Sequence, residues 1–217
     1  MKSLIAAAAL ASFAVVAGQA SAEDSDFTPK AKGRWVVDLR GTYAAPATDK
    51  NAIRKGGEPT GLDAKVSDSV VPTLGLTYFL TDHVAVEAIA GVTRHAVRAV
   101  GPGTDVDVYK TWLLPPTVTA QYHFMPKARF SPYLGTGPSA MLFFSGSNKN
   151  NFTTKLPSGM GWAAQAGADY ALKGHWSLNV DLKKVWYEAD AKIDGGALTS
   201  RVNLDPWIAS VGVGYRF

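Results

Sequence analysis

The fold is decided by the end of the chain, residues 207–217, which read Trp207-Ile-Ala-Ser-Val-Gly-Val-Gly-Tyr-Arg-Phe217. Every second residue, counted back from the end, is apolar: Phe217, Tyr215, Val213, Val211, Ala209 and Trp207. The residues between them are small or polar, apart from Ile208. Because side chains alternate between the faces of a β-strand, this stretch predicts a strand with one apolar face. Aromatic residues at both ends of that face and aliphatic residues between them are typical of a membrane-crossing strand.

The last three residues carry a second indication. A terminal Phe217 with Tyr215 two positions earlier resembles the C-terminal signal that outer-membrane β-barrels present to their assembly machinery. We therefore expect Tyr215 and Phe217 to form an assembly signal, with the β-barrel assembly machinery and outer-membrane lipid as partners. The alternative is the last strand of a soluble β-sandwich, which has no reason to end on this aromatic pair.

The start of the chain predicts export. Lys2 is followed by a short apolar run over residues 4–18 and by the A-x-A cleavage pattern Ala20-Ser-Ala22, so residues 1–22 are expected to be a cleaved signal peptide. Residues 23–33 are then a periplasmic tail. The chain has no cysteine, so burial and hydrogen bonding alone must stabilise it. The net charge of +4 is small and spread out, and no nucleic-acid partner is expected.

After residue 22, no segment approaches the roughly 18 apolar residues of a transmembrane helix. A closed β-barrel is then the remaining way to satisfy the backbone inside a membrane. Alternating apolar and other residues mark eight segments: 34–45, 70–80, 84–95, 114–124, 131–143, 161–172, 176–188 and 207–217. Segments of about 10 to 13 residues match the length of a tilted membrane strand.

The connections between these segments alternate in length. Four are long and rich in turn residues, covering residues 47–65, 96–110, 145–158 and 189–201. The others are short, as periplasmic turns are. Residues 34–217 are therefore predicted to be all-β: an eight-stranded antiparallel transmembrane β-barrel in the outer membrane of a Gram-negative cell, with four long extracellular loops. A soluble barrel such as a lipocalin has a similar rhythm, but it would turn charges such as Asp38 and Glu87 to water.

Specific stretches resemble the OmpW family of outer-membrane barrels. They include Leu74-Gly-Leu-Thr77, Leu114-Pro-Pro-Thr117, Asp205-Pro-Trp207 and the ending Gly214-Tyr-Arg-Phe217. The resemblance implies a barrel with a narrow lumen that takes up a small hydrophobic solute from outside. It also implies an exit through a lateral opening in the barrel wall into the outer leaflet.

Pro115 and Pro116 are the residues expected at that opening. Proline has no backbone N–H, so it cannot pair fully with a neighbouring strand. The pair lies at the outer end of its segment, where a break in the ladder would open the wall. The alternative is that the two prolines only terminate the strand.

The resemblance also implies that an apolar residue on the third strand and an aromatic residue on the seventh narrow the lumen. Ile89 suits the first position, but the second holds Lys183. Since a charge in a narrow lumen must be paired, Lys183 is expected to form a salt-bridge plug with Asp181, Asp169 or Glu87. The alternative is that Lys183 contacts the substrate. The residues predicted to line the channel are Ile89, Lys183, Glu87, His95, Gln121, Asp169 and Asp181.

No catalytic, cofactor or metal site is expected. His95 points inward without clustered ligands, and a hydrogen-bonded role suits it better than a metal. An outer-membrane enzyme would need a paired nucleophile and base, and Ser139 and His123 qualify only by residue type. The main alternative to a channel is a structural or adhesive barrel with a side-chain-filled lumen and partner-binding loops. A channel needs an apolar cavity near Pro115, whereas a plugged barrel needs a continuous polar network.

Overall fold

A computed structural model describes residues 26–47, 51–149, 154–155, 157–193 and 196–217. The predicted signal peptide, residues 1–22, lies outside these ranges. Within them, no helix is long and apolar enough to cross a membrane.

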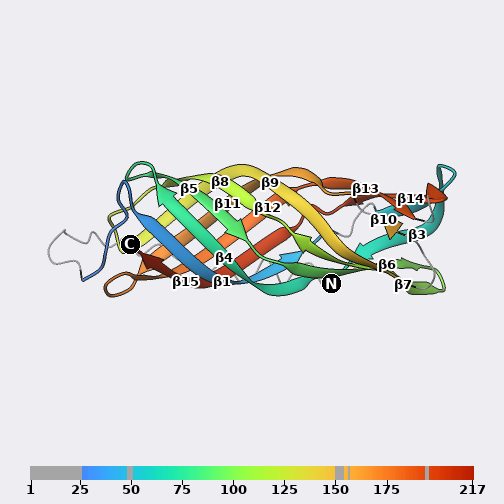
Figure 1. The fold of residues 1–217 in the computed structure, drawn as a ribbon, viewed down its shortest axis with the longest axis horizontal. Coiled ribbons are helices and arrows are strands. Elements are labelled where there is room, and N and C mark those ends of the chain that lie inside the picture. Colours follow the sequence, from blue (N-terminus) through green and yellow to red (C-terminus); the bar gives the residue numbers. More distant parts are fainter. Residues whose placement is uncertain (1–25, 48–50, 150–153, 156, 194–195) are drawn as a thin grey trace.

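Eight strands form a closed antiparallel ring (Figure 1). Each pairs with the next, and the last, β15, pairs with β1 through ten residue pairs from Val36↔Arg216 to Ala45↔Trp207. The predicted barrel and its strand order are thus confirmed. In ring order the strands are β1 (Trp35–Ala45), β4 (Ser69–Phe79), β5 (Val84–Ala90), β8 (Thr117–His123), β9 (Phe130–Asn148), β11 (Gly159–Ala171), β12 (Trp176–Trp186) and β15 (Trp207–Arg216).

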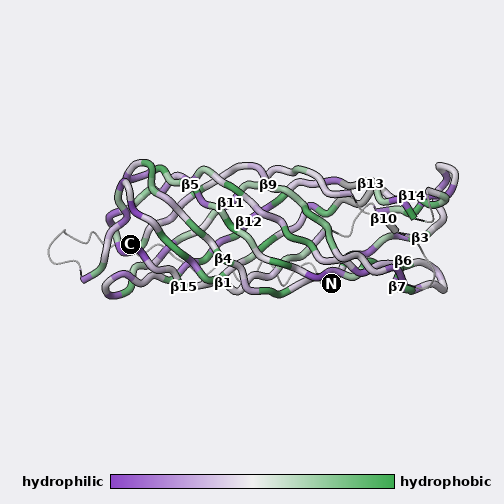
Figure 2. Tube along the Cα trace, in the orientation of Figure 1, coloured by the Kyte–Doolittle hydropathy of each residue, from purple (hydrophilic) through white to green (hydrophobic). Residues whose placement is uncertain are grey.

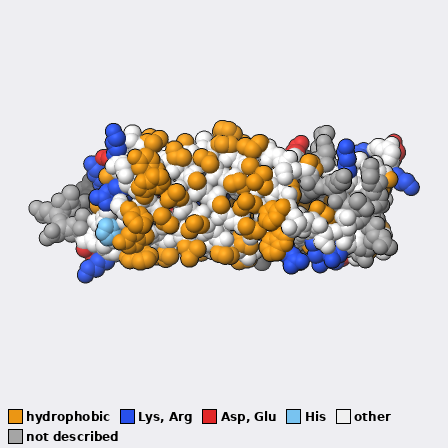
Figure 3. All heavy atoms as spheres, in the orientation of Figure 1, with side chains coloured by type: hydrophobic (Ala, Val, Ile, Leu, Met, Phe, Trp, Pro, Cys, Tyr) orange, Lys and Arg blue, Asp and Glu red, His pale blue; other side chains and the backbone are white. Residues whose placement is uncertain are grey.

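The side chains of the ring alternate as the sequence predicts. Leu39 and Val211 are 58% and 62% exposed on the outer face, whereas Asp38 and Arg40 are buried inside. Figure 2 shows this alternation along the strands, and Figure 3 shows the apolar outer band with Lys and Arg beyond its two ends. Polar residues inside and apolar residues outside are the opposite of a lipocalin, so the soluble-barrel alternative is wrong.

Aromatic side chains border the apolar band at both ends. Trp35 contacts Tyr78, and Trp176 contacts Tyr215, at the end that carries the short turns. Four exposed tryptophans stand at the other end: Trp112, Trp162, Trp186 and Trp207. The lipid-spanning region lies between these two belts.

The barrel continues outward as a second sheet, which we call the extension. Its strands are β2 (Ala52–Lys55), β3 (Glu58–Val66), β6 (Thr93–Gly101), β7 (Thr104–Leu114), β10 (Thr154–Lys155), β13 (Glu188–Ile193) and β14 (Leu198–Asn203), and the upper part of β9 pairs with β7. Residues 47–65, 96–110 and 189–201 are therefore largely paired strands rather than irregular loops. Glycines with positive φ make the hairpin turns, at Gly56 and Gly57 after β2 and at Gly103 after β6.

Polarity in the extension is reversed. On β3, Ala64 and Val66 are buried and Lys65 between them is exposed. The outer face here meets water instead of lipid, and the inner face encloses an apolar core. These strands therefore lack the apolar outward face that marks a membrane strand, which is why their sequence resembles loops.

The N-terminal tail crosses the opposite end of the barrel. Backbone N–H groups of Thr28, Lys30 and Gly33 donate to the carbonyls of Gly174, Pro126 and Phe79, at 2.7, 3.1 and 2.8 Å respectively. Residues 26–33 thus lie against the short turns and cover the mouth that faces the periplasm (Figure 1).

Candidate functional site

The lower lumen, between the two aromatic belts, is filled by ion pairs. Arg40 Nη2 lies 3.0 Å from Asp38 Oδ2 and 2.6 Å from Glu87 Oε1. Lys183 Nζ lies 3.6 Å from Glu87 Oε2 and 3.8 Å from Asp181 Oδ1. Lys183 is therefore paired inside the barrel, as expected, and Glu87 joins the two cations.

Sequence reasoning missed Lys30, which enters this network from the tail. Its Nζ donates to Asp169 Oδ2 at 2.5 Å and to Ser131 Oγ at 2.9 Å, and it lies 2.9 Å from His123 Nδ1. Asp169 was one of the partners proposed for Lys183, but Lys30 occupies it. No strand periodicity singles out a lysine in a short polar tail, so the sequence held no signal for this contact.

Neutral side chains complete the network. Tyr133 Oη donates to Asp181 at 2.9 Å, and Asn179 Nδ2 donates to Asp169 at 2.8 Å. Gln165 Nε2 donates to Glu87 at 3.1 Å. The remaining cavity measures about 10 Å³, which is too small for a solute. Among the buried residues described here, basic and acidic groups balance four against four: Lys30, Arg40, Lys183 and Arg216 against Asp38, Glu87, Asp169 and Asp181.

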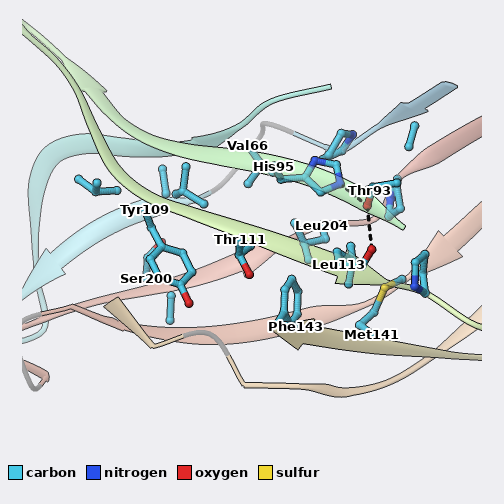
Figure 4. A pocket seen from close by; sticks show the side chains of 18 of the residues that line it. Val66, Thr93, His95, Tyr109, Thr111, Leu113, Met141, Phe143, Ser200 and Leu204 are labelled. Atoms are coloured by element: carbon cyan, nitrogen blue, oxygen red, sulfur yellow. Dashed lines mark hydrogen bonds between the residues drawn. The ribbon is translucent and has the colours of Figure 1, made fainter. Parts of the chain in front are cut away.

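A different cavity lies on the extracellular side of this plug, mostly inside the extension. Figure 4 shows side chains that line it. It measures about 50 Å³, and its lining is almost entirely apolar. Several ring and extension strands contribute to the lining: Val66 from β3, Val108 and Leu113 from β7, Met141 and Phe143 from β9, and Ile208 from β15. Leu204 and Pro115, in the connections between strands, complete it.

The polar residues of this cavity are turned to other partners. His95 Nδ1 donates to the Ser67 carbonyl at 2.7 Å, and its Nε2 lies 2.9 Å from Thr93 Oγ1 (Figure 4). His95 pairs with Thr111, which lies one residue farther from the membrane than Trp112 of the outer aromatic belt. His95 is therefore outside the lipid-spanning region. Burial lowers the pKa of His95, which keeps it neutral. The described residues hold no group of three or more potential metal ligands.

The predicted channel residues divide between the two cavities. Glu87, Gln121 and Asp169 line the lower one, and His95 lines the upper one. Lys183 and Asp181 are buried in the ion-pair network. Ile89 is half-buried on the inward face of β5 but lines neither cavity.

The backbone hydrogen bonding of the barrel wall is interrupted at Pro115 and Pro116, which connect β7 to β8. Toward β9 the wall is bonded, because the Ala140 N–H donates to the Pro116 carbonyl at 2.9 Å. Toward β5 and β6, the described chain has no backbone hydrogen bond from Gly91 or Val92 to either proline. This interruption adjoins the upper cavity, since Pro115 is part of its lining.

Ser139 and His123 do not form a catalytic pair here. Ser139 Oγ lies 2.8 Å from Thr117 Oγ1, whereas His123 contacts Lys30 and Gln121.

The closed ring, the apolar outer band and the charged interior define an outer-membrane β-barrel. The chain belongs to the OmpW family, whose sequence pattern it matches over residues 31–217.

Individual relatives agree with this assignment. The chain is 40% identical to an uncharacterized outer-membrane protein, y4mB, of Sinorhizobium fredii, over 84% of this chain and 80% of that one. It is 32% identical to outer membrane protein W of Salmonella typhimurium, over 80% of this chain and 86% of that one. The crystal structure of the outer membrane protein OprG from Pseudomonas aeruginosa matches with a TM-score of 0.81 and 27% identity, covering 89% of this chain and 99% of that chain.

Proposed function

We propose that this barrel is a passive channel for small hydrophobic molecules, which enter from outside and leave sideways through the wall at Pro115 and Pro116. The observation that carries the proposal is the position of the apolar cavity. It lies above a lumen filled by ion pairs and beside an interruption in the strand ladder.

The lower lumen supports a lateral route over a vertical one. An apolar solute moving straight down would have to separate Glu87 from Arg40 and Lys183, and leaving a buried charge unpaired is costly. At the level of the upper cavity, the solute meets apolar side chains and a wall lacking backbone bonds at Gly91 and Val92. The lower-energy path therefore leads into lipid.

The proposal assigns each predicted site residue a part. Pro115 and Pro116 keep the wall open, and His95 lines the entry route as a neutral residue. Lys183, Glu87, Asp169, Asp181 and Gln121 seal the floor. Ile89, on the same side of the barrel as the interruption, limits the downward extent of the path. No catalytic step is involved.

The test replaces both prolines with valine, which supplies an N–H and favours a strand. The wall between β5 and β8 should then pair further and close, so uptake of a small hydrophobic compound should fall severalfold. Uptake is measured in liposomes at matched amounts of folded protein. The control is Pro132→Val on β9, away from the interruption. Parent-level uptake by the double variant would favour the structural or adhesive barrel instead.

A further inference from the structure

At the same level of the barrel, a second connection joins a strand of the extension, β14, to a strand of the ring, β15. Leu204, Asp205 and Pro206 join these strands, and Leu204 and Pro206 line the upper cavity as Pro115 does. Pro206 lacks an N–H, so this connection has the same intrinsic defect as the first. Pro46, after β1, also lines the cavity, which therefore adjoins three proline-containing connections; we call those at Pro115 and Pro206 the first and the second weak point.

The second weak point is closed by bonds from β12 and from Tyr187, the residue that follows β12. The Tyr187 N–H donates to Asp205 Oδ1 at 2.8 Å, so a side chain serves as the acceptor for this N–H. Next to it, the Val185 N–H donates to the Pro206 carbonyl at 3.1 Å. Lys184 Nζ donates to the Asp205 carbonyl at 2.5 Å, and the Leu204 N–H donates to the Tyr187 carbonyl at 3.1 Å. The neighbour on the other side is also bonded, because the Ala47 N–H donates to the Leu204 carbonyl at 2.9 Å.

The two weak points differ in their bonds. In the part of the chain that the structure describes, no backbone bond from Gly91 or Val92 reaches Pro115 or Pro116, whereas the second weak point is bonded to both of its neighbours. Asp205 provides a carboxylate that accepts a backbone N–H across the gap. Pro115 and Pro116 have no polar side chain that could take this part, and the hydroxyl of the next residue, Thr117 Oγ1, donates to the Pro115 carbonyl at 3.2 Å.

We propose that Asp205 is a positioning residue that keeps a latent second opening closed and so restricts lateral exit to the side of Pro115 and Pro116. This inference rests on the proposed lateral route and adds what determines its direction. A hydrogen bond to a charged acceptor is among the stronger ones a backbone N–H can make, and losing it should favour separation of the two strands.

The experiment uses the absence of cysteine in the parent chain. Ile208→Cys places a thiol in the cavity lining, and its labelling by a maleimide confined to the bilayer reports access from lipid. Labelling is measured with the first exit closed by Pro115→Val and Pro116→Val. Adding Asp205→Ala should raise the labelling rate about tenfold or more, from the loss of one charged hydrogen bond.

Asp205→Asn is the matched variant, because its amide oxygen can still accept the Tyr187 N–H. It should label at the rate of the closed background. Val211→Cys on the lipid face measures the amount of inserted protein in every background. Equal labelling of Ile208→Cys with alanine and with asparagine at position 205 would overturn the proposal.

The same measurements distinguish failure of the proposed lateral route from failure of the role proposed for Asp205. In that case, the two proline substitutions alone would change neither uptake nor labelling, whatever residue occupies position 205. Restored uptake when Asp205→Ala is added to the closed variant would support both inferences together.

Discussion

The lower lumen and the extension are continuous along one barrel, yet they are opposite in polarity. In the lower lumen, charged side chains such as Glu87 point inward and apolar ones face lipid. In the extension, apolar side chains such as Val108 point inward and charged ones face water. The wall of the lower region faces lipid and encloses polar side chains, whereas the wall of the extension faces water and encloses apolar ones.

This difference assigns the two functional alternatives to different levels of one molecule. A continuous polar network was the expected sign of a plugged barrel, and an apolar cavity near Pro115 was the expected sign of a channel. The protein has both, with the cavity above the plug. In the proposed function the plug does not argue against transport, because it would form the floor that directs a solute sideways.

The largest expected effect comes from deleting Phe217, which should prevent both regions from folding. Phe217 ends the seam between β15 and β1, where its N–H donates to the Trp35 carbonyl at 2.9 Å, and it is 60% exposed to lipid. Deleting it removes the terminal aromatic residue of the proposed assembly signal. We expect no folded barrel in the outer membrane, measured as loss of the heat-modifiable band. Phe217→Tyr should assemble normally, and parent levels of the deletion would exclude this role.

A smaller effect should separate the two regions. Glu87→Ala leaves Arg40 and Lys183 short of a buried counter-charge, so the free energy of unfolding should fall by about 3–5 kcal/mol. Reversible unfolding from lipid vesicles measures the change. The control, Glu188→Ala at an exposed position of the extension, should stay within about 0.5 kcal/mol of the parent. Uptake per folded barrel should be less affected than stability, and equal stability losses in both variants would contradict a sealed floor.

The smallest effect concerns Asp82, in the short turn between β4 and β5 at the periplasmic end of the barrel. The backbone N–H of Lys32 and the ammonium of Lys127 lower the pKa of the exposed Asp82 carboxyl. A group whose pKa is lowered on folding stabilises the folded state above its ordinary pKa, and this contribution disappears as pH falls through the lowered pKa. Asp82→Asn should therefore be slightly less stable than the parent at neutral pH and equal to it in acid. A difference that is constant across this pH range would argue against the ionic contribution.

The sequence predicted the membrane barrel well because lipid imposes a strict alternation on each strand. It also predicted a paired Lys183, since a narrow lumen leaves a charge no other choice. Two features were beyond its reach. The extension strands have polar outer faces like those of ordinary loops, and Lys30 acts through a contact with Asp169, 139 positions away, that no local pattern encodes. Asp205 stood out as part of a motif, but its bond to Tyr187 required the structure.

The insertion of Lys30 also couples the tail to the barrel. Asp169 lies on β11, whereas the cation that pairs with it belongs to the tail and to no strand of the ring. Docking of the tail is therefore thermodynamically coupled to the folded ring, because without it Asp169 would be a buried charge without this partner. Release of the tail should loosen the periplasmic end first, while the apolar cavity at the far end remains intact.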